Sequence, residues 1–188
     1  MKLKDFGFQK GINEIIGITV GEWINTAPLG IIVDNPDSRF ARVRLYSNHT
    51  RENIKRNDRL WVNVVNDAVL FALASFEDLS EDFFESLNPP ILINSLAWCG
   101  MRAKLKGAFA ELELLSGEVI RKDVRAVNRG FNAIIEALVH ATRLVAFKDP
   151  SKRVELKERV EYYLALAEKC GGEREIEAAK IIREKIER

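Results

Sequence analysis

The stretch Asn25-Thr26-Ala27-Pro28-Leu29-Gly30-Ile31 places a proline and a glycine inside a run that otherwise has the composition of a β-strand. Proline has no backbone N–H to donate to a sheet, so this strand lies at an edge or a bulge, or faces a ligand at that point. Ala27 and Gly30 are small enough for a flat ring system to approach the main chain. These seven residues alone fit either an ordinary edge strand or a strand that binds a flat ligand.

The sequence around this stretch predicts a mainly β structure up to about residue 130. Strands are predicted at 12–20, 23–33, 40–46, 59–65, 91–96, 98–105, 109–115 and 118–127, with turns at Gly21-Glu22 and Ser116-Gly117. Short helices are predicted at 50–57 and at 68–76, the second capped by Asp67. The segment 77–90 is acidic and aromatic and ends in two prolines, which predicts an excursion over the surface. Strands at this spacing are typical of a barrel.

The pattern changes to helical spacing in the last third of the chain. Helices are predicted at 132–147, 152–170 and 173–188, separated by Asp149-Pro150-Ser151 and Gly171-Gly172. The predicted fold is therefore mainly β with C-terminal α. Residues 1–130 are expected to form the β-barrel domain, and residues 131–188 a helical module packed on it.

A candidate phosphate site follows the opening stretch. Thr50 stands where a strand gives way to a short helix, and Asn53 follows one turn later. A helix N-terminus offers unpaired N–H groups and a partial positive charge, which suit a phosphate. Arg44 on the preceding strand adds charge, and Tyr46 or Ser47 supplies a hydroxyl. The alternative is that Thr50 only caps the helix and Arg44 is a solvated strand residue.

Composition excludes several classes of function. The chain has 188 residues, 47% of them hydrophobic and 30% charged, with a net charge of +1, so it lacks the positive field of a typical nucleic-acid-binding protein. No apolar run is long enough for a membrane span, and the N-terminus lacks the apolar core of a signal peptide, so a cytoplasmic protein is expected. Cys99, Cys170 and two histidines match no metal-ligand spacing, so no metal site is expected. Abundant Glu, Lys and Arg beside a single glutamine, Gln9, are typical of proteins from hot environments.

Two groups of side chains carry open alternatives. Glu136, His140 and Arg143 share one face of a predicted helix. His140 or Arg143 either reaches a flavin or substrate, with Glu136 orienting the imidazole, or the three form a polar stripe that holds the helices to the barrel. His49 is expected to be a loop residue. The three tryptophans, Trp23, Trp61 and Trp98, are expected to be core or interface anchors.

In this order the motifs resemble a known family. The runs NTAPLGI (25–31), RLYSNHTRENI (44–54) and LWVNVVND (60–67) are similar to the N-terminal half of the FMN-binding split-barrel superfamily, which includes flavin reductases. With EALVHATR (136–143), they resemble its mostly archaeal branch, domain of unknown function 447, over roughly residues 12–170. Thr26 stands where many relatives have alanine, and its hydroxyl is expected to alter a hydrogen bond to the ring.

The resemblance implies a split β-barrel of the flavin-reductase type with a C-terminal helical extension, forming a homodimer that binds FMN. The residues implied to line the flavin ring are Asn25, Thr26, Ala27, Pro28 and Gly30, and those implied to hold the ribityl phosphate are Arg44, Tyr46, Thr50 and Asn53. A flavin-dependent oxidoreductase using NADH or NADPH is implied, with no catalytic residue assigned. The alternatives are a non-enzymatic flavin or nucleotide carrier, and a structural dimer without flavin.

Overall fold

The computed structural model describes residues 1–46 and 48–187, so the hydroxyl predicted at Ser47 lies outside the described residues. The chain divides into two compact units. The barrel unit comprises residues 1–66 and 78–123, and the helical unit comprises residues 67–77 and the chain from Val124 onward. The segment of the second predicted helix therefore belongs with the C-terminal helices, although it interrupts the barrel in the sequence.

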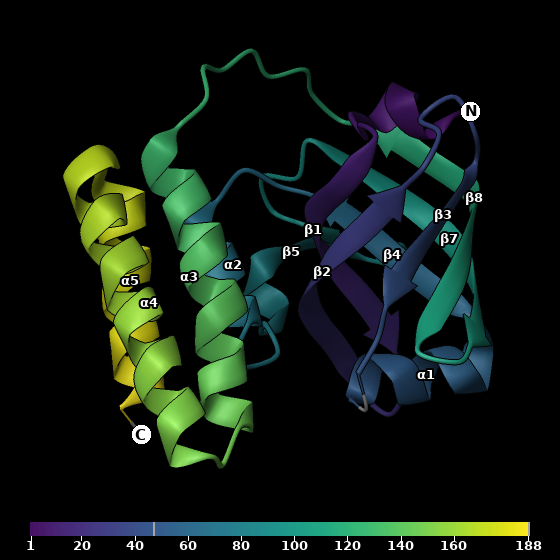
Figure 1. Cartoon of the computed structure of the whole chain (residues 1–188). Coiled ribbons are helices and arrows are strands. Elements are labelled where there is room, and N and C mark those ends of the chain that lie inside the picture. The colour runs from purple at the N-terminus through teal and green to yellow at the C-terminus, as the bar shows by residue number, and fades with distance from the viewer. Residues whose placement is uncertain (47, 188) are drawn as a thin grey trace. The chain divides into compact units, whose positions relative to one another are not determined.

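Six antiparallel strands close the barrel in the order β1-β2-β3-β8-β7-β4 (Figure 1). These strands are β1 (Gly11–Val20), β2 (Ile24–Val33), β3 (Phe40–Arg44), β4 (Arg59–Val64), β7 (Ala97–Lys106) and β8 (Phe109–Val119). The same unit holds the short helices η1 (Leu3–Phe6) and η2 (Glu81–Phe83), the helix α1 (His49–Asn57), and a separate hairpin of β5 (Phe84–Leu87) and β6 (Pro90–Leu92). The prediction of a mainly β fold with C-terminal helices is confirmed.

Alternation along the strands fills the barrel interior. On β3 and just beyond it, Val43 and Leu45 are buried while Arg42 and Arg44 are exposed, as the predicted period of two requires. The interior is packed with apolar side chains from every strand, among them Ile15, Ile31, Val43, Leu60, Met101 and Leu112. Cys99 is fully buried here, and burial raises the pKa of its thiol to about 12. The barrel is thus a filled core, and any ligand must bind at its rim or outer surface.

The predicted turn at Ser116-Gly117 is wrong. Both residues lie inside the single long strand β8, where Ser116 pairs with Gly100 and Gly117 pairs with Cys99 of β7. A Cβ on Gly117 would lie 2.6 Å from the Trp98 carbonyl oxygen and 2.7 Å from the Phe6 ring, so glycine is needed there for close packing. The glycine that suggested a turn is therefore present because of close packing. The strand predicted at 118–127 ends at Val119, since residues 120–127 do not continue it.

The region 77–96 also differs from its prediction. The predicted surface excursion contains η2 and the β5–β6 hairpin, and the predicted strand 91–96 is shortened to β6. Buried Asn63 on β4 anchors this hairpin: its Nδ2 donates to the Pro90 carbonyl at 3.1 Å, and its Oδ1 accepts from the Leu92 amide at 2.9 Å. Ser95 donates its hydroxyl to the same oxygen at 2.8 Å. These bonds to one amide side chain end β6 at a point that strand propensity does not reveal.

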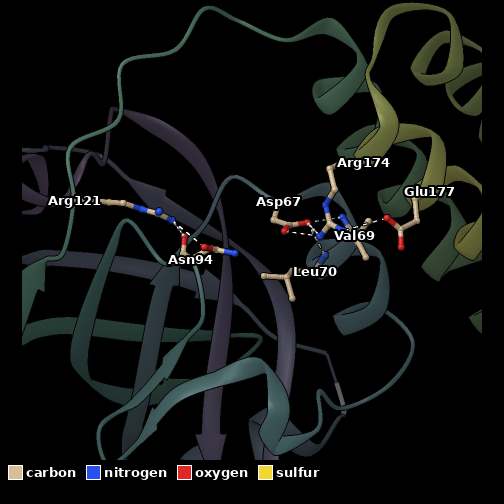
Figure 2. A network of polar contacts seen from close by, with 7 residues as sticks. All are labelled: Asp67, Val69, Leu70, Asn94, Arg121, Arg174 and Glu177. Atoms are coloured by element: carbon tan, nitrogen blue, oxygen red, sulfur yellow. Dashed lines mark hydrogen bonds and ion pairs between the residues drawn. The ribbon is translucent and has the colours of Figure 1, made fainter.

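The helical unit contains α2 (Ala68–Ala74), α3 (Arg129–Ala146), α4 (Pro150–Cys170) and α5 (Glu173–Ile186). The side chains of Asp67, Asn128 and Asp149 cap the N-termini of α2, α3 and α4. Cys170 is the last residue of α4. Figure 2 shows the best-connected cap: Asp67 accepts the Val69 and Leu70 amides and also binds Arg174, which reaches on to Glu177. The same view shows Arg121 donating to the Asn94 carbonyl within the barrel unit. In the described part of the chain, no helix combines the length and the apolar character that crossing a membrane requires.

Candidate functional site

The opening stretch forms most of β2, and one of its edges is open. β1 pairs with β2 along its whole length, whereas β3 pairs with it only at Ile31 and Ile32. The Thr26 amide donates to the Asp78 carboxylate, not to β1. Since alternate residues of a strand direct their backbone groups to the same edge, Pro28 and the N–H of Gly30 face this edge too. The structure thus explains the proline as an edge residue and directs the Gly30 N–H to the edge that β3 leaves after Ile31.

Gly30 also has a packing role. A Cβ at this position would lie 2.8 Å from Cγ2 of Ile12 and 2.9 Å from Oε1 of Glu14, both on β1. The glycine therefore makes room for side chains of the neighbouring strand as well as for close approach to its backbone. Ala27 and Pro28 are half-buried and present little side chain at the same edge.

A buried network of amides and hydroxyls joins β2 to α1. Oδ1 of Asn25 accepts the Thr50 hydroxyl at 2.9 Å and the Thr19 hydroxyl at 3.3 Å. The Asn53 amide nitrogen donates to the Thr19 oxygen at 3.1 Å. Asn25 is 7% exposed and Thr50 is 2% exposed, so their polar groups form hydrogen bonds with protein partners instead of with water. Asn25, which is predicted to line the ring, therefore bonds directly to Thr50, which is predicted to hold the phosphate, and is linked to Asn53 through Thr19.

Asp78 closes this network at its outer end. Its Oδ1 accepts from the Asn25 amide nitrogen and the Thr26 backbone N–H, each at 2.8 Å, and its Oδ2 accepts from the Trp23 indole N–H at 2.9 Å. The Thr26 hydroxyl accepts from the Leu79 amide at 2.9 Å. The hydroxyl that distinguishes Thr26 from alanine thus holds the segment after α2 against β2.

The N-terminus of α1 differs in detail from its prediction. Asn48 is the capping residue, its side chain accepting the Arg51 amide at 3.1 Å, and His49 is the first helical residue and not a loop residue. The His49 ring packs edge-on against Trp23, with ring centroids 5.2 Å apart. The amides of His49 and Thr50 belong to the first turn, where N–H groups have no partner within the helix. These two amides remain as donors for an anion.

Arg44 and Tyr46 lie on the exposed side of this region. The Arg44 guanidinium lies 5.5 Å from the centre of the Tyr46 ring, which is 63% exposed. Their side chains are therefore near one another but reach none of the buried network. Arg44 directly follows Val43, the last β3 residue paired with β2, and presents an accessible positive charge.

The stripe on α3 has no internal bonds. Among the described residues, Glu136, His140 and Arg143 make no hydrogen bond or ion pair with one another, so Glu136 does not orient the imidazole. His140 is 8% exposed and stacks on Tyr163, with ring centroids 5.8 Å apart. Its Nδ1 is buried and has no hydrogen-bond partner among the described residues. Burial, helped by the positive charges of Arg159 and Arg143, lowers the pKa of His140. A contact of His140 or Arg143 with a ligand stays a prediction.

His140 also borders a hollow of about 360 Å³ within the helical unit. The hollow is lined by His140, Glu155, Glu158, Arg159, Tyr162 and Tyr163. Across the described residues, no cluster of three or more His, Cys, Asp and Glu side chains is arranged to hold a metal ion.

The sequence prediction missed three residues of the network: Thr19, Trp23 as a hydrogen-bond donor, and Asp78. Thr19 carried a local signal, because its register partner on β1–β2 is Asn25. Asp78 carried none, since it lies 53 residues from Asn25 in an acidic loop. Its role depends on the path of the chain after α2.

Comparison with known proteins places the chain in a family. The family model described as "Protein of unknown function (DUF447) N-terminal domain" matches residues 13–128, and the model described as "Protein of unknown function (DUF447)" matches residues 128–184. A crystal structure of an FMN-bound DUF447 protein from Methanosarcina mazei is 35% identical, with a TM-score of 0.84 over 97% of this chain and 99% of that one. This relative agrees with the archaeal kinship predicted from the motifs.

More distant structures include a styrene monooxygenase flavin reductase from Pseudomonas putida, 14% identical with a TM-score of 0.48, covering 63% of this chain and 85% of that one. An FMN-binding protein from Thermus thermophilus is 11% identical with a TM-score of 0.47, over 63% of this chain and 75% of that one. The fold is a split β-barrel of the flavin-reductase type with a C-terminal helical extension. From the matches of the two models across residues 13–184, the chain belongs to the DUF447 family.

Proposed function

We propose that this protein binds FMN non-covalently at the open edge of β2 and acts as a flavin-dependent oxidoreductase. The single observation that carries the proposal is the joining of this edge to the first turn of α1 by the Asn25–Thr50 hydrogen bond. The edge offers a backbone donor to a flat ring, and the first turn offers donors to a phosphate. The FMN-bound relative at 35% identity supports the same ligand. When bound, FMN supplies hydride or electron transfer.

The residues of this chain divide the work of binding as follows. The ring lies along Asn25, Thr26, Ala27, Pro28 and Gly30, with the Gly30 amide donating to a ring acceptor. The phosphate lies between the Arg44 guanidinium and the backbone amide of Thr50, beside the Tyr46 hydroxyl. Buried Asn53 acts from behind, through Thr19.

The proposal extends to domains and assembly. The FMN-binding domain is proposed to span residues 1–130 and the helical module residues 131–188, with residues 67–77 and 124–130 falling in the helical unit by their contacts. The active form is a homodimer. Trp23 is 49% exposed and Tyr46 63% exposed beside the site, and a second subunit covering them would remove aromatic surface from water.

Flavin binding is tested by the colour of the protein. Protein purified without added cofactor, or after titration with FMN, is expected to show the flavin absorbance bands at one FMN per chain, and light scattering is expected to give the mass of a dimer. Colourless protein that does not respond to added FMN would exclude this function.

Enzymatic activity is tested separately on the loaded protein under anaerobic conditions. NADH or NADPH is expected to bleach the bound flavin. If neither does so while a chemical reductant does, the chain is better described as a flavin carrier, and the oxidoreductase part of the proposal fails.

A further inference from the structure

We propose that Asp78 is a positioning residue of the flavin site, which sets the direction of the buried hydrogen-bond network so that the Thr50 hydroxyl can only accept from the ligand. The ligand partner of Thr50 is then a hydroxyl of the ribityl chain and not the phosphate. The ligand in this inference rests on the proposed FMN function, whereas the direction of the network is a property of the free protein.

The direction begins at Asp78 because an ionised carboxylate has no proton to donate. The groups around it are all donors: the Trp23 indole N–H, the Thr26 backbone N–H and one end of the Asn25 amide. The end of the Asn25 side chain at 2.8 Å from Asp78 must therefore be the NH₂ group. Its oxygen is then turned inward, toward Thr19 and Thr50.

Each hydroxyl proton follows from that orientation. Oδ1 of Asn25 can only accept, so the protons of both Thr50 and Thr19 point to it, at 2.9 and 3.3 Å. Since Thr19 donates to Asn25, it accepts from the NH₂ group of Asn53 at 3.1 Å. All the protons of the network thus point toward Asp78, and no member is free to reverse alone.

The consequence for a ligand concerns the remaining lone pairs of Thr50. A threonine hydroxyl has one proton, and in Thr50 it is committed to Asn25. A phosphate oxygen at physiological pH needs a donor, which the hydroxyl no longer offers, although the backbone amide of Thr50 still does. A sugar hydroxyl both donates and accepts, so it fits the oxygen of Thr50. Recognition by this side chain therefore selects the polyol part of the ligand.

The test compares FMN with riboflavin, which lacks the phosphate. Thr50→Val removes the hydroxyl and keeps the shape of the side chain. It is expected to raise the Kd of both ligands by the same factor, about tenfold, the scale of one or two buried hydrogen bonds. A loss confined to FMN would mean that the Thr50 hydroxyl donates to the phosphate and would overturn the inference.

Asp78→Asn tests whether Asp78 acts through Thr50. The asparagine has one acceptor oxygen in place of two and can itself donate, so it no longer sets the direction. We expect a similar rise in Kd for both ligands. We also expect the double variant Asp78→Asn/Thr50→Val to have a Kd within about twofold of that of the weaker-binding single variant. Full additivity of the two losses would show that Asp78 acts elsewhere. Asp82→Asn removes the same charge from an exposed position nearby and is the matched control.

A readout without ligand separates this inference from the proposed function. In ¹H–¹⁵N spectra of the free protein, Asp78→Asn is expected to shift the Trp23 indole and Asn25 side-chain N–H signals, whereas Asp82→Asn leaves them in place. Unchanged signals in Asp78→Asn would overturn the network. If the wild type binds neither FMN nor riboflavin, the proposed function and the ligand part of the inference are refuted. If Asp78→Asn still shifts these signals, the direction of the network is supported.

Discussion

At the scale of single residues, the proposed site contrasts buried neutral groups with the exposed charges of Arg44 and Asp78. Asn25, Thr50 and Asn53 are nearly inaccessible and bond to one another or through Thr19, and in the proposed site Asn25 and Asn53 act from behind. Arg44 is exposed and makes no ion pair among the described residues. In the proposed site, specificity for a phosphate therefore depends on Arg44 and on backbone amides, whose charge and donors are available without breaking the network.

Arg44→Ala is expected to raise the Kd of FMN about tenfold, close to 1.4 kcal/mol, and to leave the Kd of riboflavin unchanged. The reason is that, in the proposed binding mode, the phosphate is the ligand group that the guanidinium contacts. Isothermal titration with both ligands measures the difference. Arg42→Ala is the control, because Arg42 lies on the same exposed face of β3 and pairs with Asp34 at 3.3 Å. An equal loss of riboflavin binding would contradict this role for Arg44.

At the scale of elements, caps and edges decide where strands and helices begin and what they expose. β2 has an open edge because β3 pairs with it at two residues only. The helix α1 lies between β3 and β4 in the sequence. Figure 1 shows α1 across one end of the barrel, next to the ends of these strands. The short helix α2 depends on Asp67, whose side chain accepts two backbone amides and binds Arg174 at 2.6 Å.

Replacement of Asp67 separates its cap from its ion pair. Asp67→Ala is expected to lower the free energy of unfolding by about 1–2 kcal/mol, because the Val69 and Leu70 amides lose their acceptor. Asp67→Asn keeps a good cap and loses only the charge, so its cost is expected to stay below about 1 kcal/mol. Urea denaturation measures both. Glu177→Gln, which removes the other carboxylate bound to Arg174 (Figure 2), is the control, and an asparagine variant as unstable as the alanine variant would contradict the capping role.

At the scale of the whole molecule, the free energy of unfolding is expected to depend on pH through His140 in the helical unit. Burial and the nearby arginines lower the pKa of His140 in the folded protein from an ordinary value of 6.5. As the pH falls below about 6.5, the unfolded chain takes up this proton before the folded chain does. The folded state is therefore expected to lose stability as the pH falls through this window.

His140→Phe removes this proton-linked loss and the unpartnered Nδ1, and it keeps a ring against Tyr163. We expect the variant to show a smaller fall in unfolding free energy than the wild type between pH 7.5 and pH 5.5. Chemical denaturation across this range measures the slope. Parallel curves for wild type and His140→Phe would show that His140 does not titrate differently in the two states.

Local patterns were enough to predict much of the fold and part of the site. The alternation in β3, the Asp67 cap and the helical spacing after residue 130 depend on neighbours within a few residues, so the sequence records them directly. The prediction failed at Ser116-Gly117, where a glycine serves close packing against Trp98 and Phe6 instead of a turn. Such a reason depends on residues distant in sequence.

The sequence by itself determined that the strand with Pro28 lies at an edge or a bulge, or faces a ligand at that point, because a proline cannot donate to a neighbouring strand. Only the tertiary structure decided what meets that edge. Asp78 reaches Asn25 and Thr26 across more than 50 residues, and Thr50 reaches Asn25 across 25, because the chain returns to β2 twice. A hydrogen bond depends on distance and direction in space, and no local pattern of residue types carries that information.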